Sequence, residues 1–185
     1  MALILVKEDG SGKADANTYA SVADGDAYHE GHLYASTWTA ATSDNKGKAL
    51  VMATRVLDAL VRFHGFKRST AQALQWPRRL CPDPDGDSGA VDVLGFARGP
   101  YLDETKVPAV IVSATCEMAR ELLAGDRTGD PEGVGMVQLA VAGSLTAIFD
   151  TKHPRPVVPR LVKAMLAPLG TVLEGGSGEV RLVRC

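Results

Sequence analysis

The segment from Ser43 to Phe63 is the part of the sequence that most constrains the fold. Its apolar residues recur at steps of three and four, the spacing that places side chains on one face of an α-helix. They are Ala49, Leu50, Ala53, Val56, Leu57, Leu60 and Val61. Ser43 and Asp44 precede them as helix-capping residues, and Gly65 follows as a stop signal. We therefore predict a long amphipathic helix over this segment.

A shorter helix is predicted ahead of this segment and a single helical turn behind it. Ser21, with Asp24 three residues later, forms a capping-box pair before a partial apolar face that extends to Leu33. Residues 66–76 leave room for one helical turn before Pro77, because a proline cannot continue a helix.

Two later helices are each predicted to begin at a proline. The first follows Pro108, ends at Gly125 and has an apolar stripe made of Val110, Ile111, Ala114, Met118 and Leu122. The second is short and follows Pro159. It places Leu161, Met165 and Leu169 on one side.

The remaining segments read as loop, hairpin and tail. Residues 81–106 are dense in Gly, Pro and Asp and predict a long loop. Apolar residues alternate on both sides of Gly143-Ser144, which predicts a β-hairpin. Glycines 175, 176 and 178 form a hinge before a basic tail.

Together these elements predict a mainly α fold, a small helical bundle with a β-hairpin and an extended C-terminal arm. The helical body is expected over residues 1–130 with the long loop 81–106. The hairpin, short helix and docking arm are expected over residues 131–185.

Charge and cysteine content exclude several classes of protein. The formal net charge of -2 gives no general attraction to nucleic acid, although residues 55–79 carry six Lys or Arg against one acid. Residues 81–104 reverse this balance, with six acids against Arg98. Three widely spaced cysteines predict neither a disulfide framework nor a zinc ribbon, and no apolar run predicts a membrane span.

No motif predicts an enzyme, a metal site or a cofactor site. The stretch Gly10–Ala14 lacks the first glycine and the Ser/Thr of a phosphate loop, and the loop that begins at Asp83 lacks the final glutamate of a calcium loop. His29 and His32 have a spacing that can chelate a metal, but no third ligand is near them in sequence. Cys116 lies within a predicted helix, without a catalytic partner nearby.

The stretch "QALQWPRRLC", residues 72–81, allows two interpretations. Three aromatic residues, Phe63, Phe66 and Trp76, are interleaved with five basic ones, as in platforms that stack nucleic-acid bases. The basic residues are Arg62, Lys67, Arg68, Arg78 and Arg79. A tryptophan before a proline beside an amphipathic helix is more typical of a core anchor. We therefore predict that Trp76 is a structural anchor and that Pro77 turns the chain outward.

Several runs of residues resemble one family. They are "ANTYASVADGDAYH", "KALVMATRVLDALVRFHG", "TAQALQWPRR" and "VPAVIVSATCEMARELLAG", in this order between Ala16 and Gly125. They resemble the tailed-phage proteins catalogued as DnaT-like single-stranded-DNA-binding proteins, a group related to head-to-tail connector adaptors. The ending "PRLVKAMLAPL" with "VRLVR" is similar to the family's C-terminus. The loop before Val107 and the arm beyond Gly125 depart from the family pattern.

The resemblance implies a structural virion protein without enzymatic activity. Such an adaptor forms a dodecameric ring between the portal protein and the tail or nozzle proteins, and DNA passes through its channel without sequence-specific binding. Its expected location is the head-tail junction of the virion, and the host cytoplasm during assembly, with no membrane partner.

The connector hypothesis assigns subunit or portal contacts to two groups of residues. Arg78 and Arg79 are expected near a subunit contact. The others are expected in the docking arm, and they are Leu161, Met165, Leu169, Arg181, Leu182 and Arg184.

The alternative hypothesis is a single-stranded-DNA-binding replication protein that uses Trp76 and the adjacent arginines. It ranks second because the net charge is slightly negative and no strand pattern of an OB-fold is visible.

Overall fold

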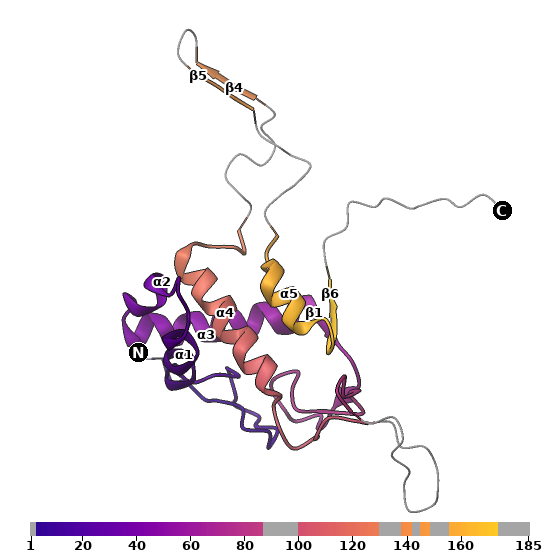
Figure 1. Cartoon of the computed structure of the whole chain (residues 1–185). Helices are drawn as coiled ribbons and strands as arrows, with labels where there is room; N and C mark the ends of the chain where they lie inside the picture. The colour runs from indigo at the N-terminus through magenta and orange to yellow at the C-terminus, as the bar shows by residue number, and fades with distance from the viewer. Residues whose placement is uncertain (1–2, 87–99, 130–137, 142–144, 149–155, 174–185) are drawn as a thin grey trace, which may run out of the picture.

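The long amphipathic segment folds into α3 (Ser43–Leu60), which crosses α4 (Ala109–Ala124) in the centre of the molecule (Figure 1). The computed structural model describes residues 3–86, 100–129, 138–141, 145–148 and 156–173. The apolar face predicted for α3 is buried along its length, from Ala49 to Leu57. The helix is capped one residue earlier than predicted, because the side chain of Thr42 accepts the backbone N–H of Asn45 at 3.3 Å.

The other predicted helices are present, and one further short helix joins them. α1 (Val22–Glu30) begins at the predicted capping box, in which Ser21 and Asp24 each accept the other's backbone N–H. α5 (Arg160–Leu166) follows Pro159 as predicted. α2 (Ser36–Thr39), a single turn, was not predicted. Both α1 and α5 pack on α4.

The predicted fold class is wrong, because the chain is a small mixed α/β structure rather than a mainly α bundle. α3 ends three residues earlier than predicted, and the chain continues as β1 (Val61–Phe63), which pairs antiparallel with β6 (Gly170–Val172). The residues of β1 fit the apolar spacing of a helix and also the alternation of a short strand. Pairing with the distant strand β6 favours the strand.

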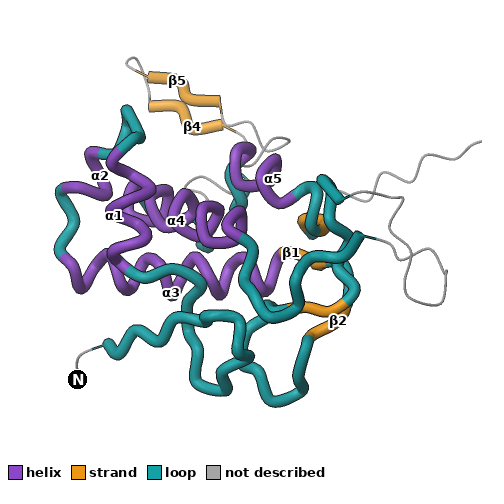
Figure 2. The backbone as a smooth tube through the Cα atoms, turned by 60° about the horizontal axis from the view of Figure 1, so that its bottom comes forward, coloured by secondary structure: helices purple, strands orange, loops and turns teal. Residues whose placement is uncertain are grey.

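A second pair of strands replaces the helical turn that was predicted for residues 66–76. β2 (Phe66–Lys67) pairs antiparallel with β3 (Arg78–Arg79), with Phe66 opposite Arg79. The residues between these strands form a loop without a helical turn. Figure 2 shows β1 and β2 at one end of α3, and α1 and α2 at the other.

Gly65 makes the turn between β1 and β2 possible. Its φ of 70° lies in the left-handed region, and a Cβ atom at this position would lie 2.2 Å from the carbonyl oxygen of Arg79. Only glycine lets the two strands approach so closely, so this residue fixes the position of Phe66.

The predicted hairpin is present as β4 (Gln138–Val141) paired antiparallel with β5 (Leu145–Ile148). Three predicted interface residues, Arg181, Leu182 and Arg184, lie outside the described residues, as does the rest of the predicted arm after Leu173. The predicted long loop is described only at its two ends, residues 81–86 and 100–106.

Residues of α5 and β6 share a single apolar core with α3, α4 and β1. Leu169, which was predicted to face a partner, is only 2% exposed and lies in this core, whereas Leu161 is 51% exposed and Met165 is partly buried. Leu169 is therefore covered by its own chain. The predicted domain boundary at residue 130 stays a prediction. Among the described helices, none is long and apolar enough to cross a membrane.

Candidate nucleic-acid interface

Trp76 is fully buried, which excludes its ring as a base-stacking surface in this structure. It belongs to the central core, and the ring of Phe63 meets it edge-on at a centroid distance of 5.7 Å. The Trp76–Pro77 peptide bond is cis. Trp76 is therefore a core residue, and its predicted role as a structural anchor together with Pro77 stays a prediction.

A buried hydrogen-bond cluster holds the backbone just before Trp76. The hydroxyl group of Tyr19 donates to Asp58 at 2.5 Å and accepts the backbone N–H groups of Gln75 and Trp76 at 3.0 and 3.2 Å. Asp58 also accepts the N–H of Gln75, at 3.0 Å. Burial raises the pKa of both Tyr19 and Asp58, because the apolar surroundings disfavour their charged forms. This cluster fastens the loop to α3.

Arg78 is also a structural residue. Its guanidinium group is largely buried and donates to four backbone carbonyl groups, those of Phe63, His64, Gly65 and Gln75, at 2.7 to 3.3 Å. These bonds join the turn after β1 to the segment that leads into β3. The N–H groups of Arg78 that make these bonds are therefore not available to a phosphate or to a partner subunit.

Phe66 and Arg79 are exposed and lie directly opposite each other across β2 and β3. Opposite residues of an antiparallel pair extend from the same face, so the two side chains share one surface. Phe66 is 69% exposed, an unusual position for a phenylalanine ring. Lys67 follows it and is exposed as well. Lys67 lies opposite Arg78, so it extends from the other face of the two strands. We refer to Phe66 and Arg79 as the β2–β3 patch.

The chain beside the β2–β3 patch adds further apolar and acidic groups. Leu80, exposed and with a φ of 55°, follows Arg79, and Tyr101 pairs with Pro82 on the neighbouring segment. Glu104 forms an ion pair with Arg79 at 3.4 Å, with both side chains about half exposed. An exposed pair of this kind contributes little stability, so Arg79 can exchange this carboxylate for another anion.

The basic stretch that was read from the sequence is dispersed by the fold. Arg55 lies on the exposed face of α3, Arg62 is the outward residue of β1, and Arg68 donates to the carbonyl oxygen of Gly10 at 2.9 Å. Together with the buried Arg78, these positions leave only part of the predicted basic cluster beside Phe66.

The phosphate-loop-like stretch binds a carboxylate of its own chain. The side chain of Glu8, fully buried, accepts the backbone N–H groups of Gly10, Gly12 and Lys13 at 2.8 to 2.9 Å. Gly10 and Gly12 have φ values of 102° and 80°, which turn their N–H groups inward. This anion-binding loop is therefore already occupied by Glu8.

No group of three or more His, Cys, Asp or Glu side chains among the described residues could hold a metal ion. Asp83 forms a turn by accepting the N–H groups of Asp85 and Gly86. Cys81 and Cys116 are buried free thiols, and burial raises the pKa of Cys116 to about 12.

His29 and His32 lie on α1 and just after it, beside Glu117 of α4. His32 Nε2 is 3.7 Å from Glu117, which also pairs with Arg120. His29 is buried. Its Nε2 atom donates to the carbonyl oxygen of Cys116 at 3.2 Å, and its Nδ1 atom has no partner among the described residues. Burial lowers the pKa of His29, because a second N–H on the ring would be unpaired.

We expect the protein to lose stability as the pH falls from about 7 to about 5, in part through His29. The folded state keeps this ring neutral, so the unfolded state binds more protons below the unfolded histidine pKa of about 6.5. Thermal melts of the wild type and of His29→Gln test this. The variant should show a smaller loss over the same interval, and equal losses would contradict the prediction.

Sequence reasoning named Phe66 only as one of several aromatic residues and favoured Trp76 as the ring of the alternative hypothesis. The sequence around Phe66 could have identified it, because Gly65 before it and the basic residues Lys67 and Arg68 after it are typical of an exposed turn. The sequence did not indicate that the exposed side chains of Leu80 and Tyr101 lie beside it.

A family model described as "Putative DnaT-like ssDNA binding protein" matches residues 1–185 of the chain. No curated protein and no solved structure matches it. The resemblance to this family is thereby confirmed. The predicted role as a virion connector adaptor is wrong on this finding, since the family description names single-stranded DNA binding, which was the alternative hypothesis.

Proposed function

Because this chain belongs to the family of DnaT-like single-stranded-DNA-binding proteins, we propose that it binds single-stranded DNA through the β2–β3 patch, without catalysing a reaction. The observation that carries this proposal is the exposed ring of Phe66 directly opposite Arg79. An aromatic surface beside a cation is the arrangement that stacks a base and neutralises its phosphate.

The patch favours single strands over duplexes. A ring can stack only on a base whose face is accessible, and bases in a duplex are covered by their neighbours. The contact with a phosphate would replace the ion pair between Arg79 and Glu104. Lys67, exposed beside Phe66 in β2, supplies further positive charge near the patch. Such contacts are tolerant of base identity, because every base has a π-face.

The net charge of -2 limits the electrostatic attraction for DNA to the surface around the β2–β3 patch. The acidic groups around Glu104 reduce the positive potential, so we expect modest affinity that falls as salt rises.

Fluorescence anisotropy with a labelled oligonucleotide of about 15 nucleotides tests the proposal. The logarithm of the wild-type binding constant should fall linearly with the logarithm of the salt concentration. Phe66→Ala should weaken binding about tenfold to a hundredfold, the loss expected for one stacked base. Tyr34→Ala is the matched control, since Tyr34 is 73% exposed in the loop between α1 and α2.

The two outcomes that contradict the proposal are distinct. A wild-type protein without salt-dependent binding would overturn the DNA-binding function itself. Binding that Phe66→Ala leaves unchanged would retain the function but place it on another surface.

The predicted ring, the portal and tail partners and the virion location stay predictions. They depended on the connector hypothesis and do not contribute to the proposal of DNA binding.

A further inference from the structure

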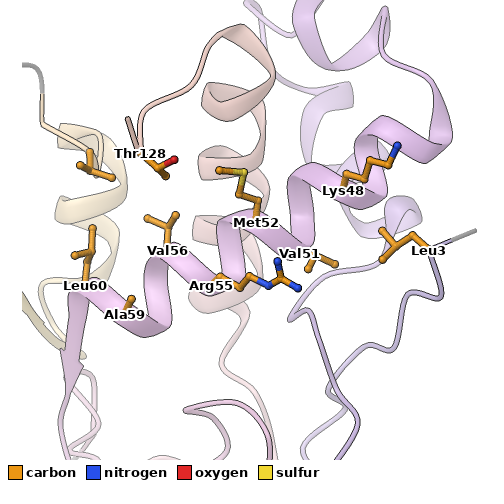
Figure 3. A pocket seen from close by; sticks show the side chains of 10 residues that line it. Leu3, Lys48, Val51, Met52, Arg55, Val56, Ala59, Leu60 and Thr128 are labelled. Atoms are coloured by element: carbon orange, nitrogen blue, oxygen red, sulfur yellow. The ribbon is translucent and has the colours of Figure 1, made fainter. Parts of the chain in front are cut away.

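A groove of about 650 Å³ runs along α3 (Figure 3), and none of its described lining residues belongs to the β2–β3 patch. Its floor is apolar, with Val51 and Val56 almost fully buried and Leu60 at one end. Leu3 lies at the other end, where Figure 3 shows it beside the N-terminal part of α3. The groove is separate from the surface proposed to bind DNA.

The exposed edge of the groove is a stripe of α3 in which cations and apolar residues alternate. Lys48, Met52, Arg55 and Ala59 follow one another at steps of three and four, so they share one face of the helix. Met52 is 38% exposed, a large apolar side chain left open to solvent. From Lys48 to Leu60 the groove spans about 18 Å of helix.

The charges that line the groove have a single sign. Lys48 and Arg55 are both positive, and no described lining residue is acidic. Among the described residues, Lys48 forms an ion pair with Asp44, one turn away on the surface, and Arg55 forms none. Two cations above an apolar floor match a partner with an apolar face and acidic flanks.

The groove suits a protein segment rather than nucleic acid. None of its described lining residues is aromatic, so it lacks a surface on which bases stack. A straight apolar groove parallel to a helix accommodates an amphipathic helix of about three turns, which binds through residues at steps of three, four and seven.

The C-terminal segments of a second copy are poorly matched to the groove in charge. α5 carries the exposed Arg160 and Leu161 and the partly buried Lys163, and the last residues of the chain carry Arg181 and Arg184. These segments would place cations against Lys48 and Arg55, and like charges in contact destabilise an interface.

We propose that the α3 groove binds an acidic amphipathic helix of a different protein. The apolar face of that helix covers Met52 and the valines beneath it, while its acidic residues pair with Lys48 and Arg55. The interaction is independent of the proposed DNA binding, so one chain can hold a DNA strand and a protein partner together.

Selection from a displayed library of random peptides of about 16 residues, against the full-length protein, tests this proposal. The wild type should enrich peptides with net negative charge and apolar residues at helical spacing. The charge-reversed variant Lys48→Glu/Arg55→Glu should instead enrich peptides with net positive charge. Met52→Glu should lower the affinity of the peptides selected on the wild type at least about tenfold.

Circular dichroism melts of the variants provide the control for folding, and Phe66→Ala should enrich the same peptides as the wild type. The proposal is overturned if no peptides are enriched, if the enriched peptides are neutral or basic, or if Met52→Glu leaves their affinity unchanged. Two other occupants would also overturn it. A dimer that Met52→Glu dissociates would indicate a second copy, and enrichment only after truncation behind Leu173 would indicate the chain's own tail.

Oligonucleotide titrations of the same variants decide between a helix and a DNA strand. Weaker DNA binding by Lys48→Glu/Arg55→Glu, together with unchanged binding by Met52→Glu, would assign the groove to nucleic acid and overturn the proposal.

Discussion

Replacing Trp76 by alanine should lower the free energy of unfolding by about 3 to 5 kcal/mol. The indole ring is fully buried in the central core and packs edge-on against Phe63, so its removal leaves a large cavity. The indole N–H has no hydrogen-bond partner among the described residues, so the loss comes from packing rather than from a polar contact. Chemical denaturation followed by circular dichroism measures the effect.

Phe66→Ala is the matched control for this prediction. Its ring is exposed, so the variant should keep its stability within about 0.5 kcal/mol while it loses DNA affinity. The opposite pattern, in which Trp76→Ala keeps its melting temperature and loses DNA affinity, would show that Trp76 rather than Phe66 is the stacking ring.

Replacing Arg78 by methionine should cost about 3 kcal/mol or more of stability. The long apolar side chain keeps much of the volume but leaves the carbonyl oxygens of Phe63, His64, Gly65 and Gln75 without this donor. Buried acceptors without a partner are costly, and lysine cannot replace the planar fork of donors.

Arg79→Met, one residue away, is the internal comparison. Because the Arg79 side chain is about half exposed and forms its one ion pair among the described residues with Glu104, this variant should remain as stable as the wild type and bind DNA more weakly. Equal stability losses in the two variants would contradict the structural role assigned to Arg78.

The helices were largely predictable because their signals are local. The capping box at Ser21 and the prolines at positions 108 and 159 mark the starts of α1, α4 and α5. The apolar spacing of α3 identified the buried face that packs against α4. Each of these features depends on residues within a few positions of one another, where the period of the helix fixes which side chains share a face.

The strands and the candidate site were not predictable in the same way. Val61 continues a helical pattern in the sequence, yet it pairs with Val172, more than a hundred positions away. The burial of Trp76 and Arg78 likewise depends on residues that are not their sequence neighbours, among them Tyr19 and Phe63. One aromatic and basic stretch was thereby divided into a core anchor, a structural arginine and an exposed patch.

By itself the sequence determined where α1, α4 and α5 begin and which face of α3 is buried, and it favoured a core position for Trp76. Only the tertiary structure decided which aromatic ring among residues 63–76 is exposed and which arginine side chain is available to a partner. It also decided that the outer edge of α3 borders an apolar groove. The physical reason is that the periodicity of a helix depends on residues close together in the sequence, whereas the exposure of a side chain depends on which distant segments cover it.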